Sequence, residues 1–224
     1  MIRRDYILRM IEEFFQALTR IRNLKRDQRL AEADAELDQE FVRLIKSGAK
    51  AVCKLSETEL LARLIQGEPT QAVRDKTLML TTLLKEAGDL AVAGNRPEEG
   101  RDCYLKGLHL LLETSRGEVF DVPAFVPTIE VFAKSLEGSS VPIETQARLM
   151  QHYEIIGEFS KAEDFLFAMI ESDPGNDRLV DFGLAFYKRL EAQADAALEF
   201  GNLPRAELAA GLAELNRRRV PGPV

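Results

Sequence analysis

The 224-residue chain contains only two histidines and two cysteines. Few side chains of these types are therefore available as nucleophiles, bases or metal ligands. His109 lies among leucines and His152 precedes Tyr153, and neither has the HExxH or ExxH spacing of zinc and di-iron sites. Cys103 and His109 are six residues apart, which places them on different faces of one helix. The sequence therefore predicts no catalytic residue, no metal site and no cofactor, and it argues against an enzyme.

Phosphate-binding and calcium-binding motifs are also missing from the sequence. Neither the P-loop pattern nor a dinucleotide-binding glycine pattern occurs. Acidic residues alternate along one predicted helix, which spreads them around it instead of gathering them into a calcium loop. We interpret this acidic row as a solvated helix face; it comprises Glu32, Asp34, Glu36, Asp38 and Glu40.

The chain carries 30 Lys and Arg against 37 Asp and Glu, a net charge of -7. This balance argues against nucleic-acid binding, which requires a positive field. Residues 151–200 hold four basic and eleven acidic side chains, which fits a solvated face or a surface for a basic partner. A nucleic-acid alternative depends on one local basic patch, formed by Arg20, Arg22, Lys25, Arg26 and Arg29.

Cysteine usage and hydropathy predict a cytoplasmic protein. Cys53 and Cys103 alone form neither a disulfide framework nor a metal cluster. No apolar run approaches the roughly 20 residues that span a bilayer. Charged residues from Arg9 to Glu13 interrupt the N-terminal apolar segment, which argues against a signal peptide.

Helical periodicity runs through nearly the whole chain, and no stretch shows sustained strand alternation. Ser56-x-x-Glu59 and Ser160-x-x-Glu163 match the capping box that opens a helix, and Gly48 is expected to close one. Arg217, Arg218 and Arg219 would complement the dipole at the last helix end. The prediction is an all-α fold of about ten helices in antiparallel hairpins, over 2–22, 30–46, 56–67, 70–93, 97–116, 123 or 127 to 136, 142–156, 160–171, 177–200 and 204–219.

The first predicted helix has an apolar stripe broader than one face of a surface helix needs. Either it is buried on two sides or it exposes a face to a second copy of the chain. The residues that would form such a self-association face are Ile7, Ile11, Phe14 and Phe15.

One inter-helix turn recurs along the chain. Gly157–Glu163 and Gly201–Glu207 repeat glycine, an apolar residue, a helix starter, a basic residue, alanine and glutamate. We expect each glycine to be left-handed, Phe159 and Leu203 to fill the hairpin corner, and Ala162 and Ala206 to allow close helix packing. Residues 95–100 are a weaker copy and residues 28–33 the faintest.

This turn and its flanking residues resemble the tetratricopeptide repeat over roughly residues 80–219. The residues at matching positions are Gly88, Tyr104 and Gly107, then Tyr153, Gly157, Ala162 and Pro174, then Ala197, Gly201, Ala206, Ala210 and Ala213. The resemblance implies an α-solenoid-type array, either a regular superhelix or a compact irregular one. The sequence predicts an N-terminal helical hairpin with a short connector helix over 1–67 and a tetratricopeptide-like repeat region over 68–224, either as separate parts or as one continuous domain.

The opening segment MIRRDYILRMI, with the helical hairpin behind it, is similar to an uncharacterised bacterial family that pairs such a segment with tetratricopeptide-like helices. That similarity implies a fold and no activity. The predicted function is a non-enzymatic adaptor or scaffold whose groove between hairpins receives a segment of a partner protein. The alternative is a small-ligand sensor or enzyme with a pocket in the helical array.

Overall fold

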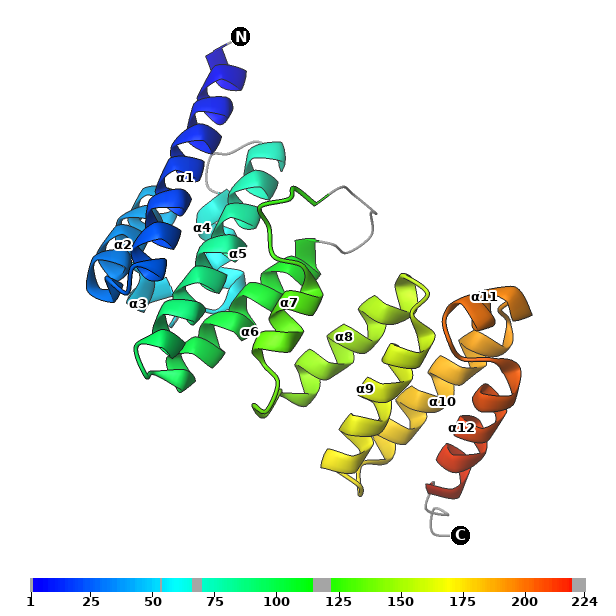
Figure 1. Cartoon of the computed structure of the whole chain (residues 1–224). Coiled ribbons are helices and arrows are strands. Elements are labelled where there is room, and N and C mark those ends of the chain that lie inside the picture. Colours follow the sequence, from blue (N-terminus) through cyan, green and yellow to red (C-terminus); the bar gives the residue numbers. More distant parts are fainter. Residues whose placement is uncertain (1, 53, 66–69, 115–121, 219–224) are drawn as a thin grey trace. The chain divides into compact units, whose positions relative to one another are not determined.

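A computed structural model describes residues 2–52, 54–65, 70–114 and 122–218 (Figure 1). These residues form twelve α-helices and no β-strand, which confirms the predicted all-α class. The predicted helix ends near residues 67 and 116 fall outside the described residues. The chain divides into two compact units, Met1–Ser140 and Val141–Val224, and each unit contains its own buried apolar residues.

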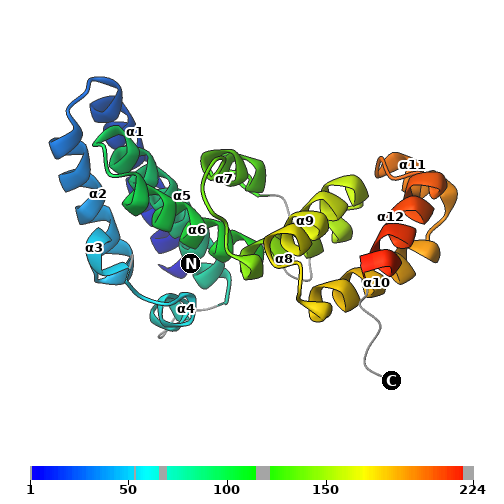
Figure 2. The same cartoon turned by 90° about the horizontal axis from the view of Figure 1, so that it is seen from below.

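The first unit is built around one central helix. Its helices are α1 (Ile2–Arg26), α2 (Leu30–Ile45), α3 (Ala49–Val52), α4 (Glu57–Ile65), α5 (Thr70–Ala93), α6 (Pro97–Thr114) and α7 (Ile129–Ser135). α5 contacts α1, α2, α4 and α6, and α7 packs against α6 (Figures 1 and 2). Every residue from 77 to 84 on α5 is buried. A helix that is covered on all sides is expected to be apolar on all its faces. Two threonines in this stretch are accommodated because their hydroxyls donate to carbonyls of the preceding turn, Thr77 to Val73 O and Thr82 to Leu78 O.

The second unit is a succession of helices in which neighbours along the chain pack together. They are α8 (Ile143–Ile155), α9 (Phe159–Ser172), α10 (Asp177–Glu191), α11 (Asp195–Phe200) and α12 (Arg205–Arg218). α8 pairs with α9, α9 with α10, and α10 with α12. Aromatic side chains fill the core between them, with Phe186 and Tyr187 fully buried.

Four hairpins share the same turn. In each, one residue is left-handed, and it is Gln28, Asn95, Gly157 or Asn202. Its N–H donates to the carbonyl three residues back, and the next N–H donates to the carbonyl five residues before it. This is the Schellman pattern, which satisfies the free carbonyls at a helix end. The repeat of turns is therefore confirmed, including the faint copy at Gln28.

The position five residues after the left-handed residue is small and buried in three of the four hairpins. It is Ala33, Gly100 and Ala162, respectively, and a β-carbon at Gly100 would meet the backbone oxygen of Gly88. Phe159 and Leu203 are buried as predicted. Ala206, however, is exposed, so its predicted role in close packing is wrong.

Two predicted helix ends are wrong by one or two residues. α2 ends at Ile45 and its left-handed residue is Lys46, not Gly48. Gly201 has a right-handed backbone, and Asn202 takes the left-handed position instead. The C-terminal turn therefore lies one residue further along the chain than the match to Gly157 suggests, and this shift is what moves Ala206 to the surface.

One of the two predicted capping boxes forms. Ser56 N–H donates to Glu59 Oε2 at 2.8 Å, and Glu59 N–H donates to Ser56 Oγ at 3.2 Å. The second prediction is wrong because α9 begins at Phe159, so Ser160 already lies inside the helix. The backbone N–H of Ser160 donates instead to the carbonyl of Gly201 at 3.0 Å.

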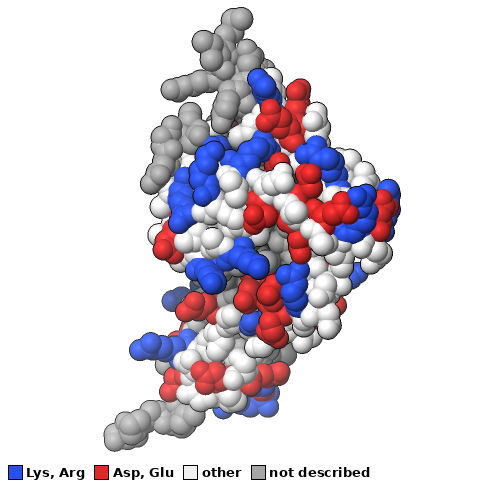
Figure 3. Space-filling view, turned by 90° about the vertical axis from the view of Figure 1, so that its left-hand side faces the viewer, with Lys and Arg blue, Asp and Glu red and all other residues white. Residues whose placement is uncertain are grey.

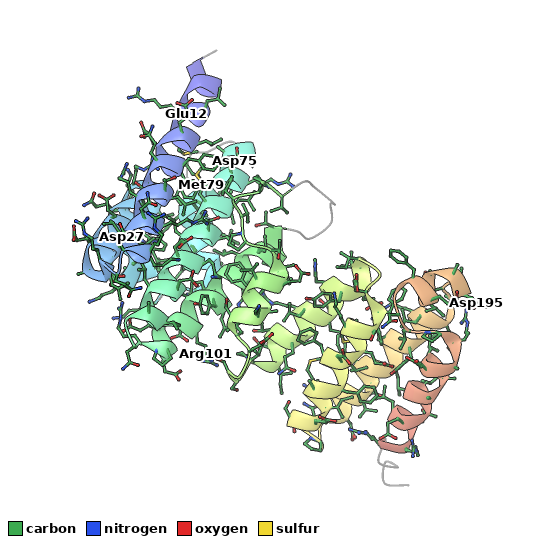
Figure 4. The ribbon with its side chains drawn as sticks, in the orientation of Figure 1. Glu12, Asp27, Asp75, Met79, Arg101 and Asp195 are labelled. Carbon is green, nitrogen blue, oxygen red and sulfur yellow. The ribbon has the colours of Figure 1, made fainter. Side chains whose placement is uncertain are left out.

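The helix predicted over 177–200 is broken after Glu191, which gives α10 and α11. Arg205 explains the break: its guanidinium donates to the carbonyls of Glu191 (3.0 Å) and Gln193 (2.6 Å). It also pairs with Asp195 at 2.7 Å, in the first turn of α11 (Figure 4). A side chain from α12 thus satisfies carbonyls that an unbroken helix would have bonded internally.

The predicted division between residues 67 and 68 falls on residues outside the described ranges and inside the first unit. α1 and α2 share one apolar core with α5, which includes Phe14, Leu37 and Leu83.

Candidate functional site

A groove of about 1020 Å³ lies in the first unit between four helices. α2 and α3 line one side, α6 lines the opposite side, and α5 lies between them (Figure 2). Its volume is at the upper end of the range of about 300–1,000 Å³ that is usual for ligand pockets. We call it the alanine groove, after its most frequent lining residue.

The floor of the alanine groove is apolar and made of short side chains. Ala87 and Ala91 lie one turn apart on α5, and Leu37 and Cys103 complete the floor from α2 and α6. Because an alanine side chain ends at its β-carbon, the axis of an incoming helix can approach to about 8 Å, the short end of the usual range.

Charged side chains bridge the alanine groove at one end. The guanidinium of Arg96, just before α6, donates to Asp34 of α2 (3.0 Å) and to Glu99 of α6 (2.8 Å). Asp38 accepts the N–H of Ala49 at 2.8 Å and so holds the first turn of α3. These bonds link α2 to α6 and α2 to α3 at this end of the groove.

The rim of the alanine groove carries a small excess of negative charge. Four lining side chains are acidic and three are basic. Arg96 is already shared by two carboxylates, and Lys50 and Lys54 are exposed at the α3 end. No sequence motif marks this rim, because it forms only when α2, α3 and α6 pack around α5.

The residues with potential for chemistry are not brought together. Cys103 is buried in the groove floor, whereas His109 of the same helix is not among the groove-lining residues. His152 lies in the second unit, with its ring against that of Tyr153. Among the described residues, no three His, Cys, Asp or Glu side chains are placed to hold a metal ion; Cys53 lies outside them.

The four residues of the predicted self-association face have different environments. Phe14 is 1% exposed and belongs to the core, and Ile11 is partly buried. Phe15 is 41% exposed, and its ring meets Phe14 and Phe125 edge-on, with centroids 6.1 and 5.1 Å away. The side chain of Ile7 is outside the described residues. Self-association through this face stays a prediction that now depends on Phe15.

The predicted basic patch does not present free positive charge. Each of its five cations has a carboxylate partner: Arg20 pairs with Glu36, Arg22 and Lys25 with Glu86, Arg26 with Asp27, and Arg29 with Glu32. These carboxylates reduce the local positive field on which phosphate binding depends. The observation weighs against the nucleic-acid alternative.

The acidic row of α2 is more than a solvated face, so that interpretation is wrong in part. Glu40 is buried, and its Oε2 accepts from both Nε (2.9 Å) and Nη2 (2.6 Å) of Arg43. Asp34 and Asp38 face the alanine groove, while Glu36 reaches Arg20 of α1. Alternation along the helix distributes these carboxylates among different neighbours, as the spacing predicts.

The last helix ends with cations that pair locally. Arg217 and Arg218 both bond to Glu214, one turn earlier. Arg218 also lies over the ring of Phe167, 5.6 Å from its centroid. Arg219 lies outside the described residues.

A half-buried ionic network joins α1, α5 and α6. Lys25 bonds Glu86 (2.5 Å) and Asp89 (2.9 Å), and Asp89 also accepts from Lys85 and the Tyr104 hydroxyl. Burial opposes charge on both groups, but the hydrogen bonds outweigh it, so the pKa of Lys25 is raised and the pKa of Asp89 is lowered. Burial and the Asp89 charge raise the pKa of Tyr104. The network therefore joins the three helices, and these pKa shifts favour the charged forms of Lys25 and Asp89 and the neutral form of Tyr104.

A second tyrosine–carboxylate pair lies in the second unit. Tyr187 donates its hydroxyl proton to Glu163, and a β-carbon at Gly211 would overlap the Tyr187 ring. Burial is the main cause that raises the pKa of Glu163, and it does so against the lowering effect of the Tyr187 bond. Burial also raises the pKa of Tyr187. This pair differs from the first-unit network in having no cation among its bonded partners.

The fold and the groove define an all-α protein of helical hairpins joined by a recurrent turn. Residues 1–220 match a family of unknown function, DUF6483, and the chain belongs to that family. This agrees with the predicted similarity to an uncharacterised family. No curated protein and no solved structure matches the chain. Within the described residues, every helix is too short or too polar to cross a membrane.

Proposed function

We propose that the chain is a non-enzymatic adaptor that works in the cytoplasm and binds a helical segment of a partner protein in the alanine groove. The observation that carries this proposal is the groove itself, whose floor of alanines leaves room for a helix. The tetratricopeptide-like turns support it, because stacked hairpins with such turns commonly present a concave surface to a peptide or helix.

The lining residues define the chemistry of that partner segment. A narrow apolar stripe would lie on Ala87 and Ala91, with residues at i, i+3, i+4 and i+7 as anchors. Lys or Arg beside the stripe would face the carboxylates of Asp38 and Asp102 on opposite walls. Such charge pairs at the rim mainly determine orientation and association rate.

The test is a pull-down from lysate of the source organism with mass spectrometry of bound proteins. Ala35 is exposed and lines the groove, so Ala35→Trp should block the groove without disturbing the core. Gln16→Trp on the exposed side of α1 is the matched control. We expect a stoichiometric partner that the wild type and Gln16→Trp retain and Ala35→Trp loses. Equal retention by all three proteins, or no partner for the wild type, would contradict the proposal.

A small-ligand sensor remains the second candidate, because the first unit has another cavity with a different lining. Ligand binding to the folded state raises the melting temperature by mass action. A metabolite panel that leaves the melting temperature unchanged would argue against this candidate.

A further inference from the structure

A second cavity of the first unit has an excess of positive charge. It has a volume of about 340 Å³ and is formed by α1, α2 and α5. Four of its lining side chains are cations, Arg9, Arg43, Lys46 and Lys76, and one is a carboxylate, Glu13. Figure 3 views the molecule from the side of α1 and α2 and shows Lys and Arg atoms gathered below the N-terminal end. We call this cavity the basic cleft.

Arg43 is held in a fixed orientation at the basic cleft. The carboxylate of Glu40, whose side chain is 10% exposed, accepts both Nε and Nη2 of Arg43. These two bonds to one oxygen, Oε2 of Glu40, restrain the orientation of the guanidinium. The remaining nitrogen, Nη1, donates to Glu13 at 3.0 Å on the cleft side. The cation is therefore oriented before any ligand arrives.

Glu13 occupies the place where an anionic ligand would bind. Its carboxylate is shared between Arg43 and Arg9 (3.1 Å), and its side chain is 47% exposed. An exposed glutamate can rotate into water at little cost, whereas Glu40 cannot. The cleft lining itself holds four cations and one carboxylate, and this composition favours an anionic ligand.

Lys46 adds a cation to the basic cleft from the C-terminal end of α2. It ends α2 in the left-handed conformation, with φ of 57°, where glycine is the usual residue. A residue with a β-carbon adopts this conformation at a cost. A cation here complements the helix dipole, while glycine would fit the left-handed backbone without strain, so this position allows a test of the charge that does not disturb the turn. Its side chain lines the cleft.

We propose that the basic cleft binds a small organic phosphate. The phosphoryl group would displace Glu13 and accept from Nη1 of Arg43 and from the lysines that line the cleft. The organic part would lie on Met10 and Leu44, the apolar lining residues. This site is separate from the alanine groove and does not depend on the adaptor proposal.

The test is isothermal titration calorimetry of the full chain with phenyl phosphate and inorganic phosphate. The salt concentration should be about 20 mM, because the interaction of exposed charges with an anion is screened at higher ionic strength. We expect saturable binding of phenyl phosphate, and weaker binding of inorganic phosphate, which lacks the apolar part. Equal affinities would overturn the organic part of the proposal. No saturable binding of phenyl phosphate would overturn the proposal as a whole.

Lys46→Gly separates binding from folding. Glycine suits the left-handed position, so the melting temperature should stay the same or rise, while phenyl phosphate affinity should fall about tenfold. Lys134→Gln removes one exposed cation from α7 and is the matched control, with unchanged affinity expected. If Lys46→Gly binds phenyl phosphate as the wild type does, the cleft is not the site.

Discussion

Glu163 is a half-buried carboxyl group that bonds the Tyr187 hydroxyl, with no cation among the partners described for it. Burial raises its pKa in the folded state, the Tyr187 hydrogen bond lowers it, and the charges of Asp164 and Glu207 raise it further. A raised folded pKa contributes stability below the unfolded value of about 4.3, and that contribution is lost as pH rises through the folded pKa. At neutral pH the ionised carboxylate therefore lowers the stability of the second unit.

Glu163→Gln should raise the melting temperature at neutral pH. The amide oxygen can still accept the hydrogen bond from the Tyr187 hydroxyl, while the half-buried negative charge is removed. We expect a rise of about 2–4 °C at pH 7.5, or about 0.5 kcal/mol in a domain of this size, and a smaller rise at pH 4. Thermal melts followed by circular dichroism at both pH values measure this. Glu171→Gln, at an exposed position on α9, is the control, and a lower midpoint for Glu163→Gln at pH 7.5 would contradict the argument.

Two adjacent phenylalanines of α1 have very different environments, and this difference allows a paired test of self-association. Phe14 lies in the core, whereas Phe15 is 41% exposed. We expect Phe15→Glu to keep its helical signal and to reduce the molar mass of an oligomer to that of the monomer. Phe14→Glu should unfold the first unit, because it places an unpaired charge in the core. Light scattering combined with circular dichroism checks both, and a folded Phe15→Glu with unaltered mass would rule out this face.

The elements themselves follow well from sequence because their ends carry local signals. Pro97, Asn95 and the Ser56–Glu59 box mark helix ends that the structure reproduces. The break after Glu191 has no such signal, because Arg205 creates it from another helix. The hydrophobic periodicity of a segment cannot predict the bond between Arg205 and the carbonyl of Glu191, because these residues are fourteen positions apart.

The candidate sites could not be predicted from the sequence because they form only when several helices pack together. The alanine groove combines α2, α3, α5 and α6, and no single helix shows more than an ordinary mixture of alanine and charge. Part of the pairing of the basic patch also arises from packing, since Glu86 lies 64 residues after Arg22, whereas Arg29 and Glu32 are an i,i+3 pair. By contrast, the broad stripe of α1 was visible in the sequence, and the structure resolves it into buried Phe14 and half-exposed Phe15.

The whole chain consists of two units with separate cores, which makes a prediction about fragments. Fragment 141–224 contains α8 to α12 and a full set of buried aromatic and leucine side chains. Its 84 residues exceed the length of about 40 below which domains usually need disulfides or metals. We expect this fragment and fragment 1–140 each to give a helical spectrum and a cooperative thermal transition.

Fragment 1–67 distinguishes the boundary after residue 140, which the structure gives, from the boundary after residue 67, which the sequence predicts. The apolar faces of α1 and α2 are covered by α5, through Leu80, Leu83 and Leu84 among others. Removing α5 exposes both faces to water, and an isolated helical pair loses most of its burial. Fragment 1–67 should therefore show little helix and no cooperative transition. A folded 1–67 together with an unfolded 1–140 would place the boundary at residue 67 instead, and would mean that the shared core with α5 adds little to the stability of the first two helices.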